Sequence, residues 1–168
     1  MIASDNVNEG DVFLLEEGIY FQTVNISKNS IRITAKGSRV IFDGKGTKAT
    51  AFLVTNDYRN CFVGENYIVC NDREGISDNG DFGMFQNNEI SYNGDIGITL
   101  NTFSVGNLVM DNKLVCNIPE NIEDRGIDNN IINNIDKPCE PCEAPSEVCE
   151  DSCNDADNSI DRSKEGVN

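Results

Sequence analysis

The stretch that decides the fold is "NYIVCN" at residues 66–71, where four mostly apolar residues stand between two asparagines. The same shape returns as "NEISYN" at 88–93 and as "NKLVCN" at 112–117, and "NNIINN" at 129–134 is a partial copy. The steps between the first three are 22 residues (66 to 88) and 24 residues (88 to 112). Repeats of this length are typical of solenoids, because one repeat cannot bury its own apolar face.

A Gly-Ile pair provides a second landmark with the same step. It occurs at 75–76, again 22 residues later at 97–98, and a third time at 126–127. The last step is 29 residues (97 to 126), which we attribute to an insertion at residues 118–125 that lengthens one turn.

Short Ile- and Val-rich segments separated by Gly and Asn favour strands, and no sustained helical periodicity interrupts them. The pattern therefore predicts an all-β fold, a right-handed parallel β-helix of about five coils with roughly 22–24 residues each. We expect the β-helix to span residues 10–135. Residues 1–9 would form a lead or cap, and residues 136–168 a loosely ordered, acidic, Cys-rich tail.

In such a solenoid the bracketing asparagines mark the corners of successive coils. Each Asn would adopt the left-handed backbone conformation of the corner and hydrogen-bond to the Asn of the next coil. The two expected ladders are Asn66/Asn88/Asn112 and Asn71/Asn93/Asn117. Period-two alternation predicts which side chains point inward. The expected inward positions are Ile68, Ile90 and Leu114, and also Cys70, Tyr92 and Cys116, whereas Tyr67, Glu89 and Lys113 are expected to point outward.

The N-terminal part resembles a known family. "GDVFLLEEGIY" at 10–20, "IRITAKG" at 31–37 and "VIFDGKG" at 40–46 resemble the opening of right-handed β-helix proteins. The downstream repeats are similar to NosD-type and pectin-lyase-like repeats, so the resemblance covers roughly residues 10–134. That superfamily includes pectate lyases, polygalacturonases, sugar-binding modules, phage tailspikes and structural surface proteins. The resemblance therefore implies a fold and not an activity.

Charge and composition narrow the classes of function. The net charge of −16 argues against nucleic acid and anionic membranes as partners. The sequence contains no histidine, which excludes histidine-based catalysis and histidine metal ligands. No apolar run is long enough for a transmembrane helix, and the first residues lack the pattern of a signal peptide.

Charged residues that follow the 22-residue step are the candidates for a binding site. Arg59 is expected beside Asp81, and Arg73 beside Asp95, with further carboxylates near the first pair. The candidate residues are Asp57, Arg59, Asp78, Asp81, Arg73 and Asp95. One interpretation is a polar groove that binds carbohydrate or calcium. The other, which we favour, is a set of exposed cross-coil ion pairs, each contributing about 0–1 kcal/mol to stability.

Aromatic residues could provide stacking platforms for sugars. Phenylalanines usually fill the interior of a β-helix, so we expect Phe62, Phe82, Phe85 and Phe103 in the core. The aromatic residues expected at the surface are Tyr20, Phe21, Tyr58 and Tyr67.

The seven cysteines fall into two groups. The tail cysteines Cys139, Cys142, Cys149 and Cys153 fit disulfides or intermolecular cross-links, a zinc knot or free thiols, and we favour disulfides. The coil cysteines Cys61, Cys70 and Cys116 lie on different strands or in non-adjacent coils, so we expect buried, unpaired thiols. The spacing of Asp155, Asp157 and Ser159 is a weak indication of calcium, because the Gly and distal Glu of a calcium loop are missing.

We interpret the chain as a non-catalytic β-helix module of a surface or structural protein that contacts carbohydrate. We expect it outside the cell or on a cell or spore surface. No cofactor other than calcium is expected. Two alternatives remain open. One is a small polysaccharide lyase or glycoside hydrolase of the pectin-lyase-like superfamily. The other is an assembly subunit or fragment of a larger β-helix protein, which self-associates through its uncapped coil ends or tail cysteines.

Overall fold

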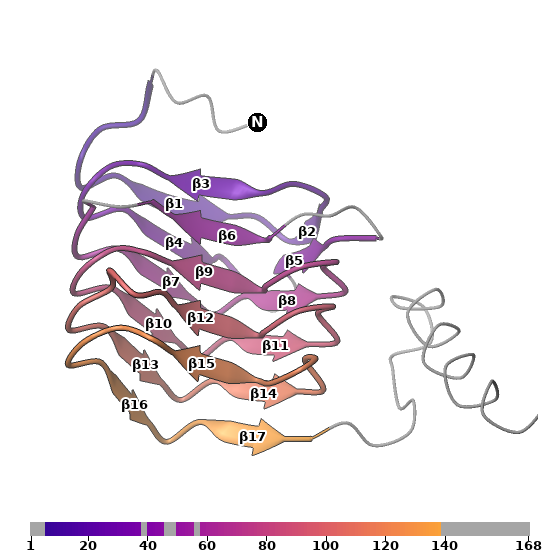
Figure 1. Ribbon diagram of the computed structural model, residues 1–168. Helices are drawn as coiled ribbons and strands as arrows, with labels where there is room; N and C mark the ends of the chain where they lie inside the picture. Colours follow the sequence, from indigo (N-terminus) through magenta and orange to yellow (C-terminus); the bar gives the residue numbers. More distant parts are fainter. Residues whose placement is uncertain (1–5, 38–39, 46–49, 56–57, 139–168) are drawn as a thin grey trace, which may run out of the picture.

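The chain forms a parallel β-solenoid of about five coils, built from three parallel sheets (Figure 1). The computed structural model describes residues 6–37, 40–45, 50–55 and 58–138, and no α-helix occurs among them. Each strand hydrogen-bonds to the equivalent strand of the next coil, three strands later in the chain. The predicted fold class is therefore confirmed.

Sheet A consists of β1 (Val12–Leu15), β4 (Arg32–Ala35), β7 (Phe62–Gly64), β10 (Met84–Gln86), β13 (Leu108–Met110) and β16 (Asn130–Ile132). Sheet B consists of β2 (Gly18–Tyr20), β5 (Val40–Asp43), β8 (Tyr67–Val69), β11 (Glu89–Ser91), β14 (Lys113–Val115) and β17 (Ile135–Lys137). Sheet C consists of β3 (Val24–Ile26), β6 (Phe52–Val54), β9 (Ile76–Asp78), β12 (Ile98–Leu100) and β15 (Ile122–Asp124). We name the three corners of each coil A–B, B–C and C–A, after the sheets that they join.

The register of the strands follows the predicted repeat in the middle coils. In sheet B, Ile68 pairs with Ile90 and Ile90 with Leu114, and all three side chains are fully buried. The column beside them, predicted to face outward, is Tyr67, Glu89 and Lys113. These three side chains are all partly exposed, which confirms their predicted direction.

The third Gly-Ile landmark was assigned to the wrong position. Ile98 pairs with Ile122, so residues 126–127 do not continue the column of Ile76 and Ile98. The connection from β14 to β15 is no longer than its counterparts in the two preceding coils. The extra residues of the 24-residue coil lie instead between β12 and β13, where residues 101–107 replace the shorter connection at 79–83.

The prediction that the bracketing asparagines adopt the left-handed backbone conformation is wrong. The bracketing asparagines do not adopt the left-handed conformation; the residue directly before each of them does. Corner A–B has positive φ at Glu65, Asn87, Asp111 and Asn133, and corner B–C has it at Cys70, Tyr92 and Cys116. Each Asn is thereby left in a position from which its side chain turns into the coil, where it is buried.

This geometry also explains why two residues expected in the core lie elsewhere. Cys70 and Tyr92 belong to a separate cluster with Ile41, Val69 and Tyr67, apart from the main core. The period-two alternation ends with the three-residue strand, because the next residue is left-handed. The prediction that Cys70, Tyr92 and Cys116 point inward extended the alternation past that point and is wrong for the first two.

The main core fills the space between the three sheets with aliphatic and phenylalanine side chains. Phe85 is fully buried as expected, and Phe42 packs edge-on against Phe52 with ring centroids 4.4 Å apart. Phe82 and Phe103 are 54% and 69% exposed, so their predicted place in the core is wrong. Both lie in corner C–A, outside the strands that define the interior.

The prediction that all three coil cysteines are unpaired thiols holds for only one of them. Cys61 is buried and free, as expected. Cys70 and Cys116 are not free thiols, so the expectation of unpaired sulfurs is wrong there. That expectation considered only pairing among the three coil cysteines themselves.

The two ends of the solenoid are marked by exposed strands. At the first coil, Val7 packs against the core, whereas Val12 and Leu14 of β1 are more than half exposed. At the last, Ile131, Ile132 and Ile135 of β16 and β17 are exposed. No helix among the described residues is long and apolar enough to cross a membrane.

Candidate functional site

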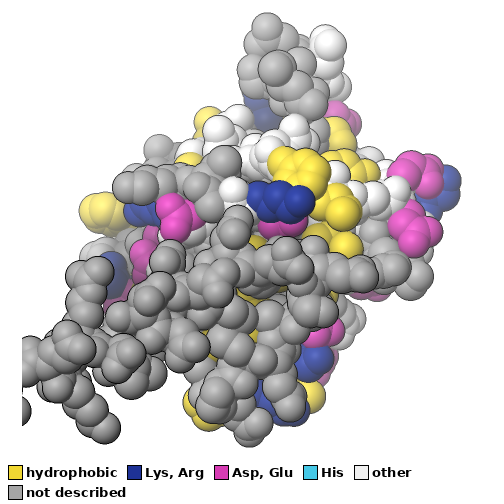
Figure 2. Space-filling view, turned by 90° about the vertical axis from the view of Figure 1, so that its right-hand side faces the viewer, with side chains coloured by type: hydrophobic (Ala, Val, Ile, Leu, Met, Phe, Trp, Pro, Cys, Tyr) yellow, Lys and Arg dark blue, Asp and Glu magenta, His cyan; other side chains and the backbone are white. Residues whose placement is uncertain are grey.

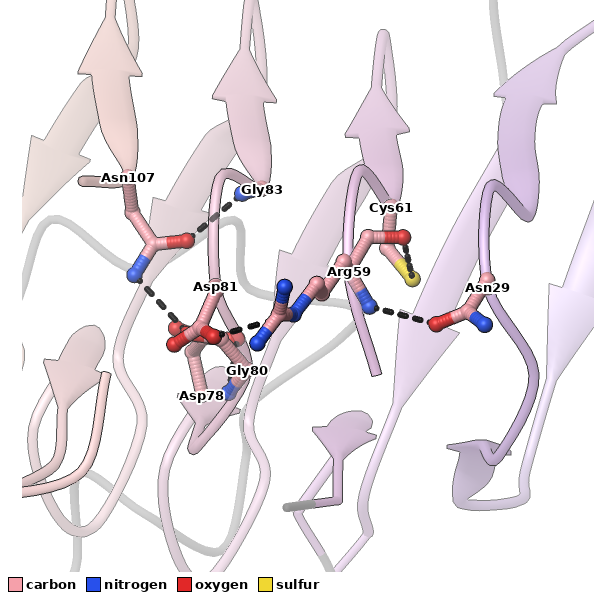
Figure 3. Close-up of polar contacts among 8 residues, drawn as sticks. All are labelled: Asn29, Arg59, Cys61, Asp78, Gly80, Asp81, Gly83 and Asn107. Atoms are coloured by element: carbon pink, nitrogen blue, oxygen red, sulfur yellow. Dashed lines mark hydrogen bonds and ion pairs between the residues drawn. The ribbon is translucent and has the colours of Figure 1, made fainter. Parts of the chain in front are cut away.

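The predicted charged residues meet in only one place among the described residues, corner C–A next to β10 (Figure 3). Arg59 and Asp81 form a parallel bridge between coils, and Arg59 Nε lies 3.2 Å from Asp81 Oδ2. This agrees with the predicted juxtaposition. Asp78 lies in the same corner, at the end of β9, and the charge of Asp81 acts on it.

The second predicted pair does not form among the described contacts. Arg73 pairs with Glu74, its neighbour in sequence, at 3.6 Å. The carboxylate of Asp95 accepts a hydrogen bond from the backbone N–H of Ile96. Asp57 lies outside the described residues.

Corner C–A is held in place by a chain of hydrogen bonds around Gly80. The Gly80 N–H donates to Asp78 Oδ1 at 3.1 Å, and Asn107 Nδ2 donates to the Gly80 carbonyl oxygen at 3.1 Å. The Gly83 N–H donates to Asn107 Oδ1 at 2.6 Å. A Cβ atom at residue 80 would collide with the carbonyl oxygen of Tyr58, so only glycine fits there.

Asp78 occupies an inward column of sheet C. It pairs with Val54 in the preceding coil and Leu100 in the next, so aliphatic side chains flank it on both sides. The residue has no solvent exposure, and Oδ2 has no hydrogen-bond partner. A buried, half-satisfied carboxyl group is costly when ionised.

Burial therefore dominates the titration of this carboxyl group. Desolvation is the main cause that raises the pKa of Asp78 to about 7, and the negative charge of Asp81 acts in the same direction. The hydrogen bond from Gly80 acts in the opposite direction, because it stabilises the carboxylate. Near neutral pH, Asp78 is consequently balanced between its neutral and charged forms.

Cys61 lies beside this carboxyl group, directly before β7. Its sulfur is 3.5 Å from the Lys28 carbonyl oxygen and 3.7 Å from that of Arg59. Burial raises the pKa of the Cys61 thiol, and the charge of Asp78 raises it too. The thiol is consequently held in its protonated, unreactive form.

Metal binding by this corner would need more ligands than the described residues provide. Among residues 6–37, 40–45, 50–55 and 58–138, no three Cys, Asp or Glu side chains gather closely enough to hold a metal ion. The predicted disulfide or zinc sites at Cys139, Cys142, Cys149 and Cys153 lie outside the described residues. The calcium-like spacing at residues 155–159 lies outside them as well.

A second candidate site is the outer face of sheet A. Its inner column runs from Phe13 through Val63 and Phe85 to Ile131, so the residues on either side of that column point outward. The two outward columns are Val12, Arg32, Phe62, Met84, Leu108 and Asn130, and Leu14, Thr34, Gly64, Gln86, Met110 and Ile132.

This outer face is apolar and almost uncharged. Of its twelve positions only Arg32 carries a charge, although the chain contains 29 acidic residues. The Arg32 guanidinium lies 4.3 Å from the centroid of the Phe62 ring. The ring extends over Gly64, where a side chain would block it. By contrast, the side of the molecule in Figure 2 presents positive side chains next to negative ones.

Two parts of these sites were not predicted from the sequence. Cys61 and Asn107 occupy the position before the first strand of their coils, and Asn129 occupies it in the last coil. The 22-residue spacing of Asn107 and Asn129 could have predicted a third, shorter asparagine ladder. The outer face of sheet A was missed because Phe62 was assigned to the core.

Comparison of the chain with protein-family models, curated proteins and solved structures finds no match. The likeness to pectin-lyase-like and NosD-type repeats therefore rests on the sequence motifs alone. The structure supports the broader class, a parallel β-helix repeat protein.

Proposed function

We propose that the chain is a non-catalytic β-helix module of a surface or structural protein, which contacts carbohydrate through the outer face of sheet A. The observation that carries this proposal is the almost uncharged, apolar outer face in a chain of net charge −16. A long apolar surface of this kind is typical of an interaction site.

Carbohydrate suits the mixture of groups on this face. The apolar faces of sugar rings pack against aromatic and aliphatic side chains such as Phe62 and Met84. Sugar hydroxyls would hydrogen-bond to the polar groups of Arg32, Thr34 and Gln86 in the same columns. The columns repeat once per coil, so the face matches an extended polymer better than a small, enclosed ligand.

Charge favours a neutral polymer over an acidic one. A polyanion approaching a chain of this net charge would be repelled at low ionic strength. Part of the same proposal is an extracellular or cell- or spore-surface location, where such polymers are found.

The test is a panel of neutral and acidic polysaccharides, with and without calcium, in which binding and product absorbance are both recorded. We expect binding to a neutral polymer without cleavage. Met84→Glu should weaken that binding at least tenfold, because a carboxylate would be buried without a partner. Ile19→Glu is the matched control, since Ile19 is an exposed residue of sheet B. Equal effects of both variants, or no binding at all, would contradict the proposal.

The enzyme alternative has one observation in its favour. Asp78 and Asp81 are neighbouring carboxylates, and the raised pKa of Asp78 is what a general acid in glycoside hydrolysis requires. Against it, Asp78 points into the coil with no exposed surface for a substrate to reach. Product formation in the panel that is lost in both Asp78→Asn and Asp81→Asn would favour the enzyme.

The assembly alternative is supported by the exposed strands at the coil ends. A second copy stacked end to end would pair its first coil with β16 and β17 and cover Ile131, the exposed last member of the inward column of sheet A. Light scattering over a range of protein concentrations tests this. Ile131→Lys should dissociate such an assembly. Association through the tail cysteines would instead be reversed by a reducing agent.

A further inference from the structure

Asp78 interrupts a column that is aliphatic in the coils on both sides. Val54 and Leu100 are its partners in register, and each is almost fully buried. Asp78 Oδ1 accepts the Gly80 N–H, but Oδ2 has no partner. A protonated carboxyl group fits this position at lower cost than a carboxylate, since only the charged form loses the full solvation of an ion.

The residues that follow Asp78 form a corner in which every backbone N–H is bonded. Asn79 donates to Val54, Asp81 to Tyr58 and Phe82 to Val105, all through carbonyl oxygens. The two glycines complete the set, since Gly80 donates to Asp78 Oδ1 and Gly83 to Asn107 Oδ1. Residues 79–83 are therefore fully hydrogen-bonded only while Asp78 stays inside the coil.

We propose that Asp78 is a proton-operated switch for corner C–A. In its neutral form Asp78 stays between Val54 and Leu100 and keeps residues 79–83 closed. Loss of the proton leaves a carboxylate in aliphatic surroundings, which favours opening of residues 79–83 so that water reaches the charge. Because β10 begins at Met84, directly after this corner, opening changes the edge of the outer face of sheet A.

The charged and ionisable groups around Asp78 in the described residues are Asp81, Arg59 and Cys61. Asp81 is the charged neighbour that acts on Asp78 in the described part of this corner, and its carboxylate is paired with Arg59. Cys61 faces the site from the residues before β7, and its thiol pKa is raised above its ordinary value. The neighbouring strands β6 and β12 contribute the uncharged Val54 and Leu100.

The direction of the pH effect follows from the raised pKa of Asp78. The closed form binds the proton up to about pH 7, whereas the exposed carboxyl group releases it near its ordinary value of 3.8. Opening therefore releases a proton over the interval between these values and becomes easier as pH rises. The opening constant should increase about a hundredfold from pH 5 to pH 8 and level off above that.

Hydrogen exchange followed by mass spectrometry or NMR tests the proposal, with rates corrected for the intrinsic pH dependence of exchange. In the unmodified protein, protection of residues 79–83 should fall about a hundredfold from pH 5 to pH 8. In Asp78→Asn it should stay constant, and in the control Asp95→Asn it should fall as in the unmodified protein. Asp78→Leu, which copies the residue type of Leu100 in the next coil, is a second variant in case the Asn variant does not fold.

Two results would overturn the switch. One is protection of residues 79–83 that does not change with pH in the unmodified protein. The other is a fall that persists in Asp78→Asn or Asp78→Leu, which would assign the pH effect to another group. Cys61→Ala should retain the full pH effect. If the pH effect disappeared in this variant, it would have to be assigned to the thiol.

Discussion

Corners A–B and B–C bury polar side chains in a different way from corner C–A. In corner A–B, each Asn directs its side-chain N–H to the Asn of the next coil, from Asn66 through Asn88 and Asn112 to Asn134. In corner C–A the equivalent column is Ile31, Cys61, Gly83, Asn107 and Asn129, and only the last two are joined in this way. The first arrangement satisfies nearly all its buried groups, and the second leaves Asp78 Oδ2 without a partner.

A buried amide is stabilising in this solenoid when the next coil supplies its acceptor. Asn88 receives two hydrogen bonds from Asn66 and donates to the Val63 carbonyl oxygen and Asn112 Oδ1. Asp78 faces aliphatic residues in both adjacent coils and cannot be satisfied in the same way. Its effect on stability consequently depends on its proton, whereas that of the ladder does not.

The largest expected effect is that of Asn88→Ala in the centre of the ladder. It removes the acceptor of two N–H groups of Asn66 and one of the donors to the Val63 carbonyl oxygen and to Asn112 Oδ1. We expect the free energy of unfolding to fall by about 3 kcal/mol or more, measured by denaturant titration. Asn134→Ala, at the more exposed end of the same ladder, should cost about 1 kcal/mol. Equal losses for both variants would show that burial of the ladder does not set its contribution.

A smaller effect is expected at the end of the second ladder, where a residue of the same coil replaces the missing Asn. Asn117 donates through its backbone and side chain to Asn121 Oδ1, and Asn121 donates to Asp136 and Lys137. Asn121→Ala should lower the free energy of unfolding by about 2 kcal/mol. A loss as large as that of Asn88→Ala would mean that a ladder end matters as much as its centre.

The smallest effect is expected for the ion pair of corner C–A. Arg59 is mostly exposed, so Arg59→Ala should change the free energy of unfolding by only about 0–1 kcal/mol. Raising the salt concentration should reduce this difference, since screening weakens exposed charges. A loss above about 2 kcal/mol would contradict the view that the pair is a surface contact.

The pH dependence of stability should also differ between Asp78 and the asparagine ladder. A group whose pKa is raised in the folded state stabilises at low pH and loses that contribution as pH rises toward the folded value. For Asp78 the loss extends from about pH 4 to about pH 7. Because only the unmodified protein loses this contribution, Asp78→Asn should become more stable relative to it as pH rises through that interval. The cost of Asn88→Ala should stay constant there.

The parts of the fold that depend on the repeat could be predicted from the sequence alone. The 22- and 24-residue steps place Ile68, Ile90 and Leu114 in one inward column, and the same steps align the asparagines of both ladders. Such alignment needs only the distance along the chain, because strands of adjacent coils pair in register. The juxtaposition of Arg59 and Asp81 was predictable for the same reason.

The backbone conformation at the corners could not be predicted from the repeat and is visible only in the folded chain. The left-handed residue stands before each Asn and not at it, which moves Cys70 and Tyr92 out of the core. The longer connection between β12 and β13 likewise leaves Phe103 at the surface. These outcomes depend on the path of the backbone between strands, and the spacing of the repeats does not specify that path. Asp78 is aligned with Val54 and Leu100 by the repeat, but its complete burial, which raises the pKa of its carboxyl group, is visible only in the folded coil.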